Sequence, residues 1–308
     1  MANFRAARRT ENPCKVCGIY VEAGYMVVWS RRNKGVVYHQ TCFNTFKPVE
    51  TVNDKGEVEI KSTATEINLK SDSDKHESFG LLLALCKSHS QQIPINIWVT
   101  GPAGSGKTKA CEQIAQELKQ PFYFIGAISE PYSLLGYRDA NGQYVRTLFR
   151  EAYENGGVFL MDEIDGSSPN ALLVFNAALA NGWCAFPDKV VPRHKDCVII
   201  AAANTFGLGG TSDYVGRVKL DAATLSRFVW VDWQYDEQLE RKLAKNDDWF
   251  ERVRSIRRKA KSLGLKILIT PRATYTGAAL LKVGINQEMV EQMVVKQGMT
   301  DEQWAQIK

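Results

Sequence analysis

The sequence predicts an α/β protein in which helices cover both faces of a parallel sheet. From about residue 77, short apolar runs alternate with amphipathic helical patterns, as in parallel strands joined by helical crossovers. A glycine-rich turn follows the first of these runs, immediately before a helical pattern. The five expected strands are Ile95–Thr100, Phe122–Ile125, Val158–Met161, Val198–Ala202 and Phe228–Val231.

Helices are expected between these strands and after them. Lys107–Lys119 and Tyr144–Tyr153 both carry apolar residues at three- and four-residue spacing, which indicates one buried helical face. From about Tyr235 the helical patterns continue without a convincing strand. We therefore expect a small all-α lid at the C-terminal end.

The 308 residues suffice for two domains and divide by composition. Residues 1–47 are compact, aromatic and rich in cysteine, and 48–76 are polar, as in a flexible linker with one short strand near Val58 and Ile60. We expect an α/β subdomain over 77–234 and the lid over 235–308.

Composition excludes several classes of protein. The apolar content of 44% is that of a globular chain, and no apolar run approaches the roughly 20 residues that cross a bilayer. The basic N-terminus lacks the apolar stretch of a signal peptide, so we expect a cytoplasmic protein without a membrane partner. An odd count of seven cysteines argues against a disulfide framework.

The glycine-rich turn matches the phosphate-binding pattern G-x-x-x-x-G-K-[ST] at every fixed position. Glycines let backbone N–H groups turn toward phosphate oxygens, and the following helix adds its positive N-terminus. We expect Lys107 to reach the β- and γ-phosphates of ATP and the Thr108 hydroxyl to bind Mg²⁺. The motif consists of Gly101, Pro102, Ala103, Gly104, Ser105, Gly106, Lys107 and Thr108.

A carboxylate pair follows the expected strand Val158–Met161. We expect Asp162 to hold the Mg²⁺ shell and Glu163 to polarise the water that attacks the γ-phosphate. Together with the phosphate-binding turn, the pair indicates a nucleoside triphosphatase site.

These motifs and the residues that follow them resemble the AAA+ ATPases. Within that P-loop NTPase superfamily the chain looks like the MoxR or dynein-related type, similar to the cobalt-chelatase small ATPase subunit and its phage-encoded relatives. The resemblance covers about residues 77–285, and a phage-encoded protein would act in the host cytoplasm.

The resemblance assigns further site residues. Val198–Asn204 looks like the sensor 1 strand, so Asn204 would orient the attacking water beside Glu163. Thr270-Pro271-Arg272 looks like sensor 2, so Arg272 would face the phosphates from the lid.

The resemblance also implies a homo-oligomeric ring, expected to be a hexamer. The segment Leu220–Phe228 is similar to the one that supplies an arginine finger to the neighbouring subunit. Arg227 is the preferred finger, with Arg217 as the alternative.

Two insertions look like hairpins that line the pore or meet substrate in such rings. Residues 133–142 contain the tight-turn dipeptide Asn141-Gly142, and residues 182–192 precede the sensor 1 strand. Tyr137, Arg138 and Phe186 either contact substrate or anchor these loops.

Near the N-terminus, Cys14-x2-Cys17-x21-His39-x2-Cys42 has the spacing of a tetrahedral zinc site. All four positions are protein ligands, so the Zn²⁺ would be structural, and the spacing resembles half of a LIM domain or a treble-clef finger. Residues 1–47 hold eight basic side chains against two acidic ones, although the whole chain carries only +5. This surplus of six would suit DNA or RNA as a partner, with a solvated basic face or a protein-docking surface as the alternatives.

The sequence thus indicates an oligomeric ATPase that remodels or moves a macromolecule. Two other hypotheses remain open: a nucleic-acid-binding ATP switch with little hydrolysis, and a MoxR-type chaperone that activates a partner protein.

Overall fold

The computed structural model describes residues 74–89 and 94–308 with their side chains, and elsewhere only the backbone of five short strands. The chain divides into two compact units, Met1–Asn68 and Leu69–Lys308. In the first unit, β1 (Asn3–Ala6), β2 (Met26–Trp29) and β3 (Tyr38–His39) form an antiparallel sheet. β4 (Val49–Val52) pairs antiparallel with β5 (Val58–Lys61), so the segment 48–76 has two strands where one was expected.

The second unit is built on a five-stranded parallel sheet, as the sequence predicts. Its strand order is β14-β6-β13-β10-β7. All five observed strands overlap the expected ones, with bounds that differ by one residue at most. They are β6 (Asn96–Thr100), β7 (Phe122–Ile125), β10 (Gly157–Met161), β13 (Cys197–Ala203) and β14 (Val229–Asp232).

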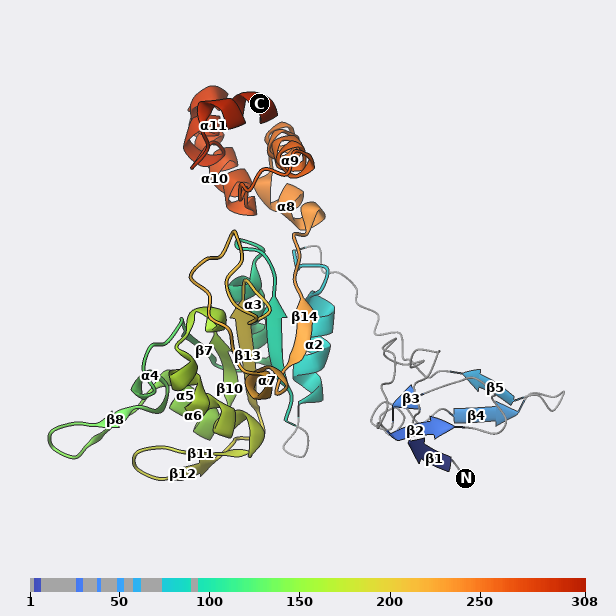
Figure 1. Cartoon of the computed structure of the whole chain (residues 1–308), viewed down its shortest axis with the longest axis vertical. Helices are drawn as coiled ribbons and strands as arrows, with labels where there is room; N and C mark the ends of the chain where they lie inside the picture. The colour runs from blue at the N-terminus through green and yellow to red at the C-terminus, as the bar shows by residue number, and fades with distance from the viewer. Residues whose placement is uncertain are drawn as a thin grey trace. The chain divides into compact units, whose positions relative to one another are not determined.

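Alternate residues of the sheet enter two separate cores. On one face, Ile97 and Val99 pack with α2 (Phe79–Ser88) and α3 (Lys107–Leu118). On the other, Trp98 packs with the cluster that includes α5 (Leu148–Asn155) and α6 (Pro169–Ala180). Figure 1 shows these helices covering the sheet. Side chains of a strand point alternately to the two faces of the sheet. Since both faces are buried, successive residues of the central strands must be apolar, which explains their continuous apolar runs in the sequence.

The prediction of a helix over Tyr144–Tyr153 was wrong at its N-terminal end. The helix begins at Leu148, because the Thr147 side chain caps it by accepting the Arg150 N–H. Tyr144 and Val145 instead form β9, which pairs with β8 (Tyr137–Arg138) after the short helix α4 (Tyr132–Leu135). The apolar spacing continued past the true start of the helix because Val145 belongs to the hairpin.

The lid is all-α, as expected. Each of its five helices begins after an Asp, Asn or Thr whose side chain accepts a backbone N–H, which satisfies one of the free donors of the first turn. None of the helices in the described part of the chain is long and apolar enough to cross a membrane. The five are α8 (Glu237–Ala244), α9 (Asp247–Ser262), α10 (Pro271–Lys282), α11 (Gln287–Val294) and α12 (Asp301–Ile307).

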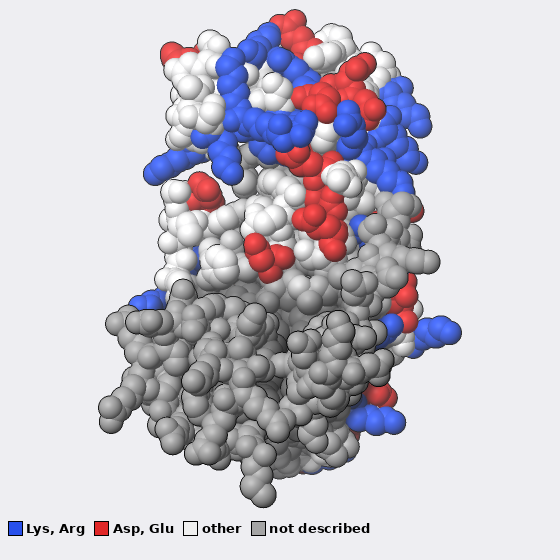
Figure 2. Space-filling view, turned by 90° about the vertical axis from the view of Figure 1, so that its right-hand side faces the viewer, with Lys and Arg blue, Asp and Glu red and all other residues white. Residues whose placement is uncertain are grey.

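A buried ion pair joins the lid helices α8 and α9. The Glu240 carboxylate is almost fully buried, accepts two hydrogen bonds from Arg257 of 2.8 and 2.9 Å, and also accepts one from the Thr274 hydroxyl. Arg257 further donates to the Ile269 carbonyl at 2.8 Å, so it holds the segment that leads into α10. At the lid surface, basic and acidic side chains lie intermixed (Figure 2), as in the pair between Arg254 and Glu237.

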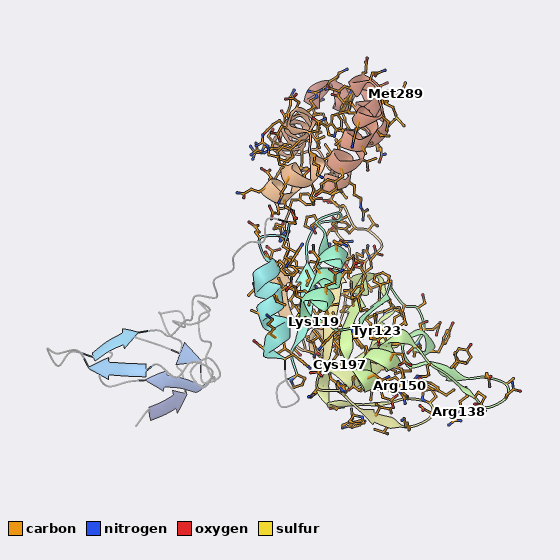
Figure 3. All side chains as sticks on the ribbon, turned by 180° about the vertical axis from the view of Figure 1, so that it is seen from behind. Lys119, Tyr123, Arg138, Arg150, Cys197 and Met289 are labelled. Atoms are coloured by element: carbon orange, nitrogen blue, oxygen red, sulfur yellow. The ribbon has the colours of Figure 1, made fainter. Side chains whose placement is uncertain are left out.

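Two hairpins far apart in the sequence form one unit. The hairpin of β11 (Trp183–Ala185) and β12 (Val190–Pro192) is joined to the β8–β9 hairpin by Arg150. Its fully buried guanidinium donates to Asp188, between β11 and β12, and lies 5.3 Å from the ring centroid of Tyr144 on β9. Arg150 also lies over the Phe186 ring, 4.3 Å from its centroid. Figure 3 shows Arg150 close to the extended hairpin that carries Arg138. We call residues 137–145 and 183–192 the paired hairpins.

Candidate phosphate and catalytic site

The phosphate-binding turn lies between the carboxyl end of β6 and the first residue of α3. Gly104 and Gly106 have φ angles of 79° and 87°, in the left-handed region that favours glycine. Gly101 must be glycine for a different reason, since a β-carbon there would lie 1.9 Å from the Trp233 carbonyl oxygen. The Ser105 hydroxyl is buried and makes no hydrogen bond to the described residues. This geometry suits a loop whose polar groups receive a phosphate group.

Lys107 is buried at the centre of this turn. Its Nζ donates to the Gly101 carbonyl at 2.8 Å, the Pro102 carbonyl at 3.1 Å and Asn204 Oδ1 at 3.0 Å. Burial lowers the pKa of Lys107 to about 8, against the opposing effect of nearby carboxylates. The ammonium thus replaces its hydration shell with loop carbonyls and with the Asn204 side-chain oxygen.

A hydroxyl and a carboxylate meet where Mg²⁺ is expected. Thr108 Oγ1 donates to Asp162 Oδ2 over 2.7 Å, which joins the start of α3 to the end of β10. Such hard oxygen ligands suit Mg²⁺, so this pair fits the predicted metal site. Glu163 follows with a left-handed φ of 53° and a side chain 56% exposed, so its carboxylate is accessible to water.

Asp165 organises the loops around Glu163, a role that no sequence pattern indicated. Its carboxylate is fully buried, and Oδ2 accepts hydrogen bonds from the Thr205 N–H at 3.0 Å and from the Thr205 hydroxyl at 2.8 Å. Arg217 Nη1 lies 3.3 Å from Asp165 Oδ1 and 3.5 Å from Glu163 Oε2. Arg217 is therefore an ion-pair partner of the acidic residues of its own chain.

The lid reaches the phosphate-binding turn through the start of α10. A β-carbon on Gly104 would lie 3.1 Å from Thr270 Cβ and 3.6 Å from Arg272 Cγ. Arg272 is exposed, and its charge also lowers the pKa of Lys107. The expected sensor 2 residue thus stands beside the turn that it would serve.

Three aromatic side chains make hydrogen bonds to the backbone of the turn. The sequence did not single them out as site residues. The Tyr214 hydroxyl accepts the Ala103 N–H at 2.9 Å, and the Tyr235 hydroxyl donates to the Ala103 carbonyl at 2.9 Å. Trp233 donates from Nε1 to the Ser105 carbonyl at 3.0 Å. Trp233 and Tyr235 lie one and three residues after the end of β14. Their position just past the carboxyl end of an expected parallel strand is the sequence signal that could have identified them.

Arg227 lies at the opposite edge of the sheet from the phosphate-binding turn of its own chain. Its carbonyl accepts a hydrogen bond of 3.1 Å from the Asn96 side chain, at the first residue of β6, whereas the turn follows the last. The five residues of β6 span roughly 16 Å at about 3.3 Å each. Arg227 Nη1 donates to the Ala223 carbonyl.

The paired hairpins place their expected contact residues differently. Phe186 is buried against Arg150 and Phe149, so it anchors the hairpin. Tyr137 is half exposed and packs edge-on against Tyr132. Arg138 is exposed and donates to the Pro187 carbonyl at 3.2 Å, which links the two hairpins.

The structure does not describe the side chains of the predicted zinc ligands. Cys14, Cys17 and Cys42 lie outside the described residues, and of His39 only the backbone is described. Among residues 74–89 and 94–308, no three His, Cys, Asp or Glu side chains gather as a metal site.

The lowered pKa of Lys107 predicts a pH dependence of phosphate binding. The free chain carries a charged Lys107 below pH 8 and loses that charge above it, so we expect triphosphate affinity to fall by up to about tenfold per pH unit above pH 8. Titration with a fluorescent ATP analogue between pH 6.5 and 9.5 measures this. Lys107→Arg keeps its charge, so its affinity should stay level over this range; a parallel fall in both proteins would contradict the assignment.

Comparison with known proteins matches the part of the chain that forms this site. Residues 97–212 match the family model described as "ATPase family associated with various cellular activities (AAA)". "Uncharacterized protein YojN" of Bacillus subtilis is 28% identical over 152 residues, 46% of this chain and 48% of the relative. "Uncharacterized protein SAUSA300_1302" of Staphylococcus aureus is 30% identical over 156 residues, 46% of this chain and 56% of the relative. The chain thus spans about half the length of these curated relatives.

Solved structures with a similar chain trace include the RuvB Holliday junction branch migration motor of Thermotoga maritima and NtrX of Brucella abortus. The RuvB structure is 17% identical with a TM-score of 0.45, over 74% of this chain and 72% of that one. The NtrX structure is 17% identical with a TM-score of 0.42, over 73% and 51% of the two chains. The family match covers the phosphate-binding turn, Asp162, Glu163 and Asn204, so residues 97–212 are similar to an AAA ATPase domain.

Proposed function

We propose that this chain binds ATP with Mg²⁺ at residues 101–108 and hydrolyses it. The observation that carries the proposal is the hydrogen bond between Thr108 and Asp162, because it brings both expected Mg²⁺ ligands together beside Lys107. Glu163 adjoins them with an accessible carboxylate. Groups that bind phosphate, hold a metal and accept a proton are thereby gathered at one edge of the sheet.

Each residue has a distinct part in this proposal. The loop N–H groups and Lys107 hold the β- and γ-phosphates, and Thr108 and Asp162 hold Mg²⁺, which when bound neutralises phosphate charge. Glu163 takes the proton of the attacking water, and Asn204 fixes the position of that water. Arg272 approaches the phosphates from the lid.

Substitutions separate binding from hydrolysis. Lys107→Ala removes the buried ammonium and should abolish ATP binding. Glu163→Gln keeps the shape but cannot accept a proton, so it should bind ATP and lose turnover by about 10²- to 10⁴-fold. Equilibrium binding and steady-state phosphate release measure the two effects. Normal hydrolysis by Glu163→Gln would show that another group is the base.

The active form in this proposal is a homo-oligomeric ring, a hexamer, with Arg227 acting on the ATP of the neighbouring subunit. Support comes from its place at the opposite edge of the sheet, where it cannot serve the site of its own chain. A cation near the γ-phosphate stabilises the charge that develops during transfer. Arg217 is the weaker candidate, because it is paired with Glu163 and Asp165.

Mixing two inactive variants tests this arrangement. Arg227→Ala should bind ATP and lose turnover by about 10³-fold, and Lys107→Ala keeps an intact Arg227. In a 1:1 mixture, about a quarter of the interfaces pair a working site with a working finger, so turnover should recover to about a quarter of wild type. Each variant mixed with itself is the control; no recovery in the mixture would contradict a finger in trans.

The ATPase cycle would remodel or move a macromolecule that meets the paired hairpins. Their rigid attachment through Arg150 and the exposure of Tyr137 and Arg138 support this part of the proposal. The basic surplus of residues 1–47 favours a nucleic acid as a further partner, and a partner protein activated as by MoxR-type chaperones is the alternative. We place the protein in the cytoplasm.

A structural Zn²⁺ ion bound by Cys14, Cys17, His39 and Cys42 completes the proposal. It rests on the spacing of these four residues in the sequence.

The purified full-length chain should contain about one equivalent of zinc by elemental analysis. Cys14→Ala with Cys17→Ala should lose it, because two of the four ligands are removed. Cys86→Ala, at a buried cysteine of α2, is the matched control and should retain it. A wild-type chain free of zinc after purification without chelators would contradict the assignment.

A further inference from the structure

One loop touches the phosphate site at two points. The chain leaves β13 after Ala203 and returns toward α7 (Ala222–Leu225). On the way, Tyr214 contacts the phosphate-binding turn and Arg217 contacts Glu163. We call residues 206–219 the site loop.

Tyr214 occupies a backbone donor of the phosphate-binding turn. The Ala103 N–H donates to the Tyr214 hydroxyl at 2.9 Å, inside the motif whose N–H groups receive phosphate oxygens. Tyr235 holds the same residue differently, because its hydroxyl donates to the Ala103 carbonyl. An ionised phosphate oxygen is a stronger acceptor than a phenol and can replace Tyr214, but it has no proton with which to replace Tyr235.

Arg217 holds the expected base. Its Nη1 lies 3.5 Å from Glu163 Oε2 and 3.3 Å from Asp165 Oδ1, and its side chain is largely buried. A β-carbon on Gly166 would lie 2.7 Å from the same nitrogen, so the guanidinium is packed tightly against the turn after Glu163. The Glu163 carboxylate is thereby paired with a cation of its own chain.

The site loop is folded so that these two contacts belong together. Thr211 and Tyr214 exchange backbone hydrogen bonds of 3.1 and 3.3 Å, and the Val218 N–H donates to the Asp165 carbonyl at 2.9 Å. Gly210 allows the close turn, since a β-carbon there would lie 2.7 Å from the Val215 carbonyl oxygen. Only two residues separate Tyr214 from Arg217, so a displacement of one bears directly on the other.

We propose that Tyr214 and Arg217 are coupled positioning residues that restrain the nucleotide-free site, and that entry of a nucleoside triphosphate releases both. Phosphate takes the Ala103 N–H from Tyr214, the site loop shifts, and Arg217 leaves Glu163 free to accept a proton. This inference rests on the proposed function, because it requires that residues 101–108 bind a triphosphate.

The first test compares two matched tyrosine variants of the full-length chain. Tyr214→Phe removes only the hydroxyl that competes with phosphate, so a fluorescent ATP analogue with Mg²⁺ should bind about 2- to 10-fold more tightly, the range that one net hydrogen bond corresponds to. Tyr235→Phe removes a donor that phosphate cannot replace, so it should bind the analogue equally or more weakly. Equal or weaker binding by Tyr214→Phe would overturn the proposal.

The second test separates restraint from direct catalysis. Arg217→Gln should raise basal kcat by about 2- to 10-fold with little change in the KM for ATP, because it frees Glu163. Arg217→Lys keeps a cation but loses the planar guanidinium, so its kcat should lie between those of wild type and Arg217→Gln. A loss of turnover in Arg217→Gln with ATP binding intact would overturn the proposal. Arg217→Gln leaves the Asp165 carboxylate buried without its cation, so thermal melting of this variant monitors its folding. If it does not fold, the comparison of Tyr214→Phe with Tyr235→Phe decides the proposal.

Lys107→Ala distinguishes this inference from the proposed function. If the wild-type chain binds no triphosphate, both fall. If it binds and Lys107→Ala does not, the phosphate site stands, and the Tyr214 and Arg217 variants alone decide the coupling.

Discussion

The parallel pairing of β6, β10 and β13 is the constraint on which the site depends. Thr100 lies opposite Ala203, and Ala201 lies opposite Met161, so the three strands end at one edge of the sheet. Each strand then continues into a functional segment: the phosphate-binding turn, the acidic pair and Asn204. Burial of alternate residues on both faces fixes this register, because a slip by one residue would exchange the two cores.

The second level of organisation is the way that the lid and the loops close around this edge. The buried pair of Glu240 and Arg257 holds the segment before α10, and Arg257 also lies over the Tyr235 ring, 5.1 Å from its centroid. The same pair therefore supports Tyr235 on the phosphate-binding turn and the approach of Thr270 to Gly104. Glu240, Arg257 and Tyr235 thus link the lid to the phosphate-binding turn.

The features that could be predicted from the sequence are those that depend on residues close together in the chain. The parallel strands are uninterrupted apolar runs, so their bounds were predicted closely, and the phosphate motif could be located in the sequence because it is contiguous. The start of α5 was misplaced because the pairing of Tyr144 and Val145 with the preceding hairpin is not visible in helical spacing. The contacts of Tyr214 with Ala103 and of Arg217 with Glu163 join positions 111 and 54 residues apart, and no periodicity encodes such loop geometry.

Arg150 gives the paired hairpins a mechanical property. Moving the β11–β12 hairpin away would separate the buried Arg150 guanidinium from Asp188, and breaking a buried ion pair costs about 3–5 kcal/mol. The two hairpins should therefore move together as one rigid unit rather than as two independent flexible loops. The paired hairpins are anchored to α5, which carries Arg150 and ends at Asn155. Strand β10 begins two residues later at Gly157 and leads to Asp162 and Glu163. A force applied to the tips of the hairpins would therefore be transmitted through α5 and β10 to the edge of the sheet that carries Asp162 and Glu163.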